Sequence, residues 1–174
     1  MTAAVVFEEI RRGRIKLTDE FTVSENAWRK GGAPSRGSTM FLALGSKVPV
    51  SELIPGLIVL SGNDAAIVLA EGIAGSEENF ARLMTERARE MGLEKSTFRN
   101  ASGMGEAEQR TTMREMALLA AHVIRTYPAE YAVFGLREYT WNKIKQSNRN
   151  PLLTMDIGAD GLKTGNIGES GFGL

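Results

Sequence analysis

The sequence predicts a mixed fold, of the α+β type within the broad α/β class, in which a helical body packs against an antiparallel sheet. Two patterns indicate this fold. Apolar residues recur at helical spacing between residues 51 and 127, and segments typical of strands follow at Arg137–Asn142 and Gly161–Leu174. The chain has 174 residues, 43% of them hydrophobic, which is enough to bury one sizeable core.

The first part of the chain predicts one helix and several short extended pieces. Residues 1–12 form an apolar helical pattern that ends before Gly13. No Ser, Asp or Asn precedes this pattern to cap its first turn, so we expect the start of the helix to be missing. Residues 14–50 contain extended pieces such as Glu20–Val23, and the glycine-rich stretch Gly31–Gly37 predicts a loop.

Residues 51–127 are expected to form a helical subdomain, which begins with two adjacent helices. In the first helix, Ser51 is the expected cap, and the helix runs toward Leu60. The second helix spans Asn63–Ala74 and is almost free of polar residues until Glu71. A helix that is apolar on all sides is buried, so this one should lie at the centre of the fold.

Two further helices complete the predicted helical subdomain. Ser76 opens the first of them, and Gly92 follows its end. The second begins at Thr112, which has the spacing of a capping box with Glu115, and it stops at Pro128. Both carry an apolar stripe on one face and should lie at the surface of the core.

Residues 1–50 and 128–174 are expected to contribute to the part of the fold that contains the sheet. The segment Gly161–Leu174 reads as a strand that has no later strand to pair with. Together with the uncapped first helix, this pattern predicts a fold that is incomplete at both ends.

Composition excludes several classes of function. Lysine plus arginine equals aspartate plus glutamate at 21 each, so there is no basic excess for binding nucleic acid. The chain has no cysteine and one histidine, His122, which effectively excludes a structural zinc site, and we expect no metal ion or organic cofactor. No signal-peptide pattern opens the sequence, and no apolar run approaches the roughly 20 residues of a membrane span.

The segment Lys163-Thr164-Gly165 combines a cation, a hydroxyl and a position without a side chain. On an edge strand this combination suits a bound carboxylate, because the ammonium supplies charge and the hydroxyl a hydrogen bond. Glycine at the third position allows a ligand to lie against the backbone. Alone, the tripeptide is weak support for a site.

A second candidate site is Ser61-Gly-Asn63, at the turn before the predicted buried helix. A serine hydroxyl can pass a proton, and an asparagine amide can hold a peptide carbonyl, so the pair suits acyl transfer. As an isolated feature, ordinary helix capping is the simpler explanation of this pattern.

Several motifs occur together in a fixed order. Their sequences are GSTMFL (37–42), LIVLSGNDAA (57–66), AEGIAGS (70–76), FRNASGM (98–104), NRNPLL (148–153) and DGLKTG (160–165). In order and spacing, the chain resembles the low-molecular-mass penicillin-binding proteins, and in particular the serine D-alanyl-D-alanine carboxypeptidases. The resemblance implies that residues 1–174 are part of one DD-peptidase catalytic domain, with the fold of the β-lactamases and DD-peptidases.

The resemblance also implies roles for the candidate residues. Ser61 would help to shuttle a proton to the leaving amine, and Asn63 would hold the substrate backbone. Lys163 would support Ser61 and the substrate carboxylate, while Thr164 donates a hydrogen bond and Gly165 keeps the strand open. The implied partners are D-Ala-D-Ala peptidoglycan stem peptides and β-lactams, in the periplasm or elsewhere in the extracytoplasmic envelope, with membrane association only through segments absent from this sequence.

The sequence departs from the family in one important respect. No serine in it is followed by lysine three positions later, so the Ser-x-x-Lys motif that carries the nucleophile is absent. The favoured hypothesis is a carboxypeptidase fragment that is inactive alone. A nucleophile-free pseudoenzyme that binds stem peptides and a related serine β-lactamase are alternatives. A serine–histidine–carboxylate triad around His122 is disfavoured, because no Gly-x-Ser-x-Gly turn occurs.

Overall fold

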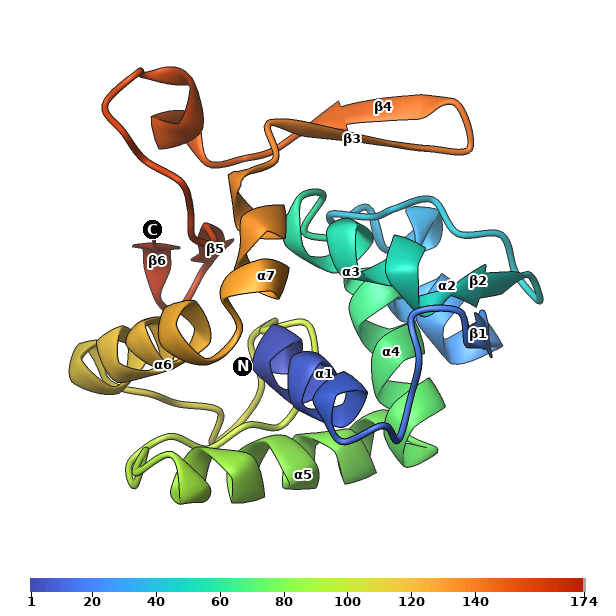
Figure 1. Cartoon of the computed structure of the whole chain (residues 1–174). Helices are drawn as coiled ribbons and strands as arrows, with labels where there is room; N and C mark the ends of the chain where they lie inside the picture. Colours follow the sequence, from blue (N-terminus) through green and yellow to red (C-terminus); the bar gives the residue numbers. More distant parts are fainter. Residues whose placement is uncertain (174) are drawn as a thin grey trace.

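The computed structural model describes residues 1–173. Helices form most of the body of the molecule (Figure 1). The α-helices are α1 (Thr2–Arg11), α2 (Glu25–Gly31), α3 (Val50–Ile58), α4 (Asn63–Ala74), α5 (Glu77–Glu90), α6 (Met113–Thr126) and α7 (Pro128–Tyr131). Short 3-10 turns are η1 (Ala33–Ser35), η2 (Ala132–Gly135) and η3 (Pro151–Thr154).

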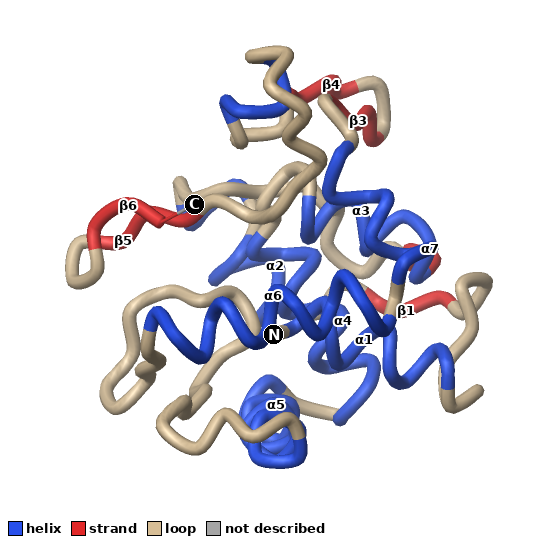
Figure 2. Tube along the Cα trace, turned by 60° about the vertical axis from the view of Figure 1, so that its left-hand side comes forward, coloured by secondary structure: helices blue, strands red, loops and turns tan. Residues whose placement is uncertain are grey.

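The strands within residues 1–173 form three separate two-stranded antiparallel sheets. They are β1 (Glu20–Thr22) with β2 (Lys47–Pro49), β3 (Glu138–Trp141) with β4 (Ile144–Ser147), and β5 (Gly165–Ile167) with β6 (Gly171–Gly173). The predicted class, helices combined with antiparallel strands, is confirmed. Figure 2 shows the β5–β6 hairpin projecting from the helical body.

The helix α4 is the centre of the fold, as the sequence predicts. Its first eight residues, Asn63–Ala70, are all buried. It contacts α2, α3 and α5, and Figure 1 shows it between these elements. The contact with α2 is especially close, because a Cβ on Gly31 would lie 2.3 Å from the backbone nitrogen of Asp64. Only glycine allows the two helices to approach this closely.

Two helices in the first half of the chain differ from the sequence prediction. Gly31 is the last residue of α2 and not part of a loop, and Ser24 caps this helix by accepting a hydrogen bond from the Ala27 amide at 2.9 Å. The prediction that Ser51 caps a helix is also wrong. The helix α3 begins at Val50, after Pro49, because the extended backbone of β2 leads directly into it.

The caps of the later helices are confirmed in part. The Ser76 hydroxyl accepts a hydrogen bond from the Asn79 amide, and the Thr112 hydroxyl accepts one from the Glu115 amide. The reciprocal half of the capping box does not form. The carboxylate of Glu115 instead accepts hydrogen bonds from the backbone amide of Lys95 and the hydroxyl of Ser96.

The C-terminal segment does not form the single unpaired strand that the sequence predicts. Residues up to Thr164 are irregular, β5 begins at Gly165, and the chain then turns back to pair with itself as β6. Positive φ at Gly171 permits the return. Leu174, the last residue of the predicted strand, lies outside the described residues.

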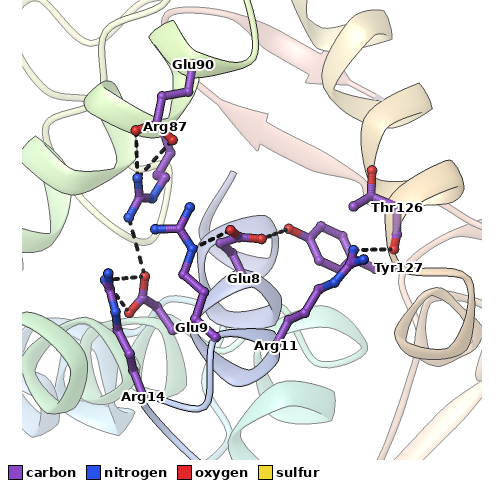
Figure 3. A network of polar contacts seen from close by, with 9 residues as sticks. Glu8, Glu9, Arg11, Arg14, Arg87, Glu90, Thr126 and Tyr127 are labelled. Atoms are coloured by element: carbon purple, nitrogen blue, oxygen red, sulfur yellow. Dashed lines mark hydrogen bonds and ion pairs between the residues drawn. The ribbon is translucent and has the colours of Figure 1, made fainter.

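A network of charged side chains fixes α1 against α5 and α6 (Figure 3). Tyr127 donates a hydrogen bond to Glu8 at 2.6 Å, which joins the end of α6 to α1. Glu9 is 3% exposed and lies between Arg14 at 3.1 Å and Arg87, on α5, at 3.8 Å. A buried carboxylate is tolerated when it is paired in this way, so the network holds three helices in one arrangement.

The carboxylate of Asp64 joins the start of α4 to the preceding loop. Asp64 is completely buried and accepts hydrogen bonds from the Thr39 hydroxyl at 2.7 Å and the backbone amides of Met40 and Leu42 at 2.8 and 3.1 Å. The amide of Ala65 supplies a fourth donor at 3.0 Å. This one side chain therefore accepts hydrogen bonds from three polar groups of a loop that has no regular structure of its own.

We expect Asp64→Ala to lower the free energy of unfolding by about 3 kcal/mol, because it leaves several buried donors unpaired. Chemical denaturation measures the change. The control is Glu25→Ala, which removes a carboxylate that is 66% exposed and paired with Arg29, and it should cost less than about 0.5 kcal/mol. Equal losses for the two variants would contradict the structural role given to Asp64.

Candidate active site

Ser61 lies in the turn between α3 and α4, in a backbone conformation that serine rarely adopts. Its φ is +56°, in the left-handed region. Two backbone hydrogen bonds hold the turn: the Gly62 amide donates to Gly56 at 2.9 Å, and the Asn63 amide donates to Ser38 at 2.9 Å. Such a conformation persists only where the surroundings fix it, and here they direct the Ser61 side chain toward the C-terminal segment.

The simple alternative for Ser61 and Asn63, helix capping, is not what the structure shows. Gly62 is the N-cap of α4, and no side chain makes the cap hydrogen bond. Asn63 is 9% exposed, and its side chain forms no hydrogen bond with any residue that the structure describes. Its amide nitrogen lies 3.0 Å from where a Cβ on Gly37 would be. Both polar side chains are thus free of a capping role.

Lys163 contacts Ser61 directly, although 102 residues separate them in the sequence. Its ammonium donates a hydrogen bond to the Ser61 hydroxyl at 2.9 Å and another to the carbonyl of Thr164 at 2.5 Å. Burial, and to a smaller extent the nearby positive charge of Arg149, lowers the pKa of Lys163 from 10.5 to about 8. Near neutral pH this lysine can therefore both donate and accept a proton.

Thr164 and Gly165 continue from Lys163 into the projecting hairpin. Lys163 and Thr164 precede β5, and only Gly165 belongs to the strand. This differs from the prediction that all three residues lie on one edge strand. A Cβ placed on Gly165 would meet no atom of residues 1–173 within 4 Å, so this part of the backbone is open to a ligand. The structure thus brings Ser61 and Lys163 into contact and places Thr164 and Gly165 next in the chain.

Sequence reasoning missed Asp64, which follows the Ser61-Gly-Asn63 motif directly. An acidic residue in the first turn of a helix is common at the surface, where it needs no partner. The available signal was its position within a helix otherwise expected to be buried, since a buried carboxylate requires hydrogen-bond donors. Those donors come from residues 39–42, which no short-range pattern connects to Asp64.

His122 lies within a helix, as predicted. It is part of α6, where its ring packs edge-on against Tyr127 with ring centroids 5.8 Å apart. No serine hydroxyl in residues 1–173 forms a hydrogen bond with it. Within the same residues, no group of three or more potential ligands is arranged to hold a metal ion, and no helix is both long and apolar enough to cross a membrane.

Solved structures that superpose on this chain include penicillin-binding proteins. Penicillin-binding protein 5 from Haemophilus influenzae superposes with a TM-score of 0.92 at 40% identity, over 98% of this chain and 49% of that one. Penicillin-binding protein D2 from Listeria monocytogenes, in its ampicillin-bound form, gives a TM-score of 0.78 at 26% identity, over 98% and 68%. The fold is therefore that of the penicillin-binding proteins.

The sequence comparisons identify the family. The model of the D-alanyl-D-alanine carboxypeptidase family matches residues 1–174. D-alanyl-D-alanine carboxypeptidase DacC of Escherichia coli is 44% identical over 176 aligned residues, which cover all of this chain and 44% of DacC. The chain belongs to the D-alanyl-D-alanine carboxypeptidase family, a family of bacterial cell-envelope enzymes, and spans less than half the length of this curated relative.

The lowered pKa of Lys163 can be measured by NMR titration of lysine-labelled protein, with its signal assigned by its loss in Lys163→Arg. We expect a value of about 8. Arg149→Gln removes a neighbouring positive charge and should raise the pKa, while burial keeps it below 10.5. Arg82→Gln, on the exposed face of α5, is the control and should leave the pKa unchanged.

The difference between the pKa of Lys163 in the folded chain and that of an ordinary lysine makes the stability depend on pH. The unfolded chain binds the lysine proton more tightly than the folded chain, so this group makes the free energy of unfolding rise as the pH increases from 8 toward 10.5. Lys163→Met should remove this rise. A stability that falls over the same interval because of Lys163 would contradict the direction of the shift.

Proposed function

We propose that this chain contributes Ser61, Asn63 and Lys163 to the active site of a serine-type D-alanyl-D-alanine carboxypeptidase. The reaction removes the terminal D-alanine from peptidoglycan stem pentapeptides through an acyl-enzyme. The observation that carries the proposal is the 2.9 Å hydrogen bond between Lys163 and Ser61, in a chain of this family. Residues 1–174 form part of one catalytic domain, with residues 51–127 as its helical subdomain and residues 1–50 and 128–174 in the sheet-containing part.

Ser61 and Lys163 form a proton relay in this proposal. When the peptide bond breaks, the nitrogen of the departing D-alanine needs a proton. The Ser61 hydroxyl gives its proton to that nitrogen, and the ammonium of Lys163 replaces it through the existing hydrogen bond. A lysine with a pKa of about 8 gives up this proton more easily than an ordinary lysine and regains it in the next step.

The remaining candidate residues bind the substrate. The amide of Asn63, which has no hydrogen-bond partner within residues 1–173, holds a carbonyl of the peptide backbone, and its burial at the start of α4 fixes its position. The charge of Lys163 and the hydroxyl of Thr164 attract the C-terminal carboxylate. Because Gly165 has no side chain and no atom of residues 1–173 lies where its Cβ would be, the peptide can lie along the backbone at this point.

The nucleophile is a serine outside the 174 residues, because no Ser-x-x-Lys occurs within them. In the acylation step its oxygen attacks the carbonyl carbon of the penultimate D-alanine while its proton passes to the lysine of the same motif. The bond to the nitrogen of the terminal D-alanine then breaks, and water later hydrolyses the ester and restores the serine. The absence of this motif also favours a second candidate function, in which a nucleophile-free protein binds stem peptides without cleaving them.

β-Lactams are the second class of ligand. The ampicillin-bound and cefotaxime-bound forms of the Listeria protein support this assignment, since the present chain has the same fold. A β-lactam presents a carboxylate and a reactive carbonyl, which suit Lys163 and the acylating serine respectively. Because peptidoglycan is the substrate, the site of action is the periplasm or another extracytoplasmic part of the envelope.

The test of the proposed function is the intact mass of the protein from its native source, before and after incubation with benzylpenicillin. We expect a species heavier than 18.9 kDa that gains the mass of one penicillin. An unextended chain without an adduct would overturn the enzyme proposal and favour stem-peptide binding. Rapid deacylation of the adduct would indicate a β-lactamase.

Lys163→Met in the intact protein should slow acylation by benzylpenicillin by about 100-fold, because it removes both the relay proton and a charge that binds the carboxylate. The rate can be followed with a fluorescent penicillin. Lys145→Met is the matched control: Lys145 is exposed in β4, is paired with Glu138 at 2.7 Å, and should leave the rate unchanged. Equal rates for Lys163→Met and the unmodified protein would refute the role of Lys163.

A further inference from the structure

Lys163 lies in a segment that has little support from its own backbone. Residues 156–164 form no helix or strand. In the part of the chain that the structure describes, their backbone groups form no hydrogen bonds with other backbone groups. A segment of this kind would move freely on its own, and a moving Lys163 could not keep a 2.9 Å contact with Ser61.

The first support for this segment is Asn150. This residue is 1% exposed, and its side-chain amide donates a hydrogen bond to the carbonyl of Gly161 at 2.8 Å. The position of the amide is itself fixed. The side-chain oxygen of Asn150 accepts a hydrogen bond from the Leu152 amide at 3.0 Å, and its backbone amide donates to the Asn148 side chain at 3.0 Å. Asn150 thus joins η3 to the residues that precede Lys163.

The second support is Tyr131, at the end of α7. Its hydroxyl donates a hydrogen bond to the carboxylate of Asp160 at 2.8 Å. Its ring stacks on Phe134 with centroids 5.5 Å apart, so the tyrosine cannot swing away without losing this contact. A Cβ on Gly161 would lie 2.6 Å from the Tyr131 hydroxyl, which shows how closely the backbone of the segment approaches it.

The two supports act on adjacent residues from different elements. Asn150 holds Gly161, and Tyr131 holds Asp160, two and three positions before Lys163. Leu162, between them and the lysine, packs against the main hydrophobic core. The three residues that lead into Lys163 are therefore each held by a contact with another part of the fold.

We propose that Asn150 and Tyr131 are positioning residues that clamp residues 160–161 and so set the distance between Lys163 and Ser61. Neither touches Ser61 in the structure. The consequence for catalysis rests on the proposed function, because the clamp is useful to the reaction only if Lys163 relays a proton. A misplacement of about 1 Å in such a relay is enough to slow a reaction by up to about 100-fold.

The test compares single changes that each remove one hydrogen bond. Tyr131→Phe removes the hydroxyl and retains the ring. Asn150→Ser retains an oxygen that can accept from the Leu152 amide but is too short to reach Gly161. The matched control is Tyr139→Phe, which also removes a hydroxyl that donates to a carboxylate, that of Glu52, away from residues 160–163.

The first measurement is the NMR titration of Lys163 in the intact protein with each change. A segment that is released exposes the ammonium to water, so Tyr131→Phe and Asn150→Ser should move its pKa from about 8 toward 10.5. Tyr139→Phe should leave it unchanged. Unchanged titration in both clamp variants, or an equal change in the control, would overturn the proposal.

The second measurement is the rate of acylation by benzylpenicillin as a function of pH. We expect acylation of both clamp variants to be slower by about 10-fold to 100-fold. The inflection of the pH profile that reports the titration of Lys163 should move to higher pH. A slower rate with an unchanged profile would indicate a merely structural role and contradict the clamp. If the unmodified protein forms no adduct, the proposed function fails, while the NMR titration still decides whether the clamp exists.

Discussion

The candidate site depends on one constraint: the carboxylate of Asp64 is completely buried and must be supplied with hydrogen-bond donors. The donors come from Thr39, Met40 and Leu42, so the loop closes around the start of α4. The carbonyl of Ser38, in the same loop, accepts a hydrogen bond from the backbone amide of Asn63. The burial of a single charge thereby fixes the loop, the beginning of the helix and the turn that carries the two polar side chains of the motif.

The site is assembled from two kinds of structure with different mechanical properties. Ser61 and Asn63 belong to the rigid centre of the fold, where α4 contacts α2, α3 and α5. Lys163 belongs to an irregular segment that other side chains hold in place. Helix packing therefore fixes the positions of Ser61 and Asn63, and a few directed hydrogen bonds fix the position of Lys163. If Lys163 lay within a strand, its sheet would hold it in place. Within residues 1–173, however, β5 begins only after Thr164, so side-chain hydrogen bonds must do so.

Local sequence signals predicted the elements that local chemistry controls. The helix α4 was predicted because residues 63–74 are almost free of polar side chains, and α5 and α6 because apolar periodicity, cap residues and stop signals agreed. The helix α2 was missed because Gly31, which reads as a loop residue, is required by the close approach of Asp64. The proximity of Ser61 and Lys163 followed only from family resemblance. No periodicity connects residues so far apart. The donors to Asp64 could not be predicted for the same reason, because they are distant from it in the sequence.

The separation of 102 residues between Ser61 and Lys163 also has a consequence for folding. A contact that closes so long a loop forms only after the entropy of closure has been offset by other interactions. The helices between the two residues must pack first, and the C-terminal segment must then dock on them. The site is thus completed at the end of folding, and partly folded chains, which lack the contact, have no assembled relay.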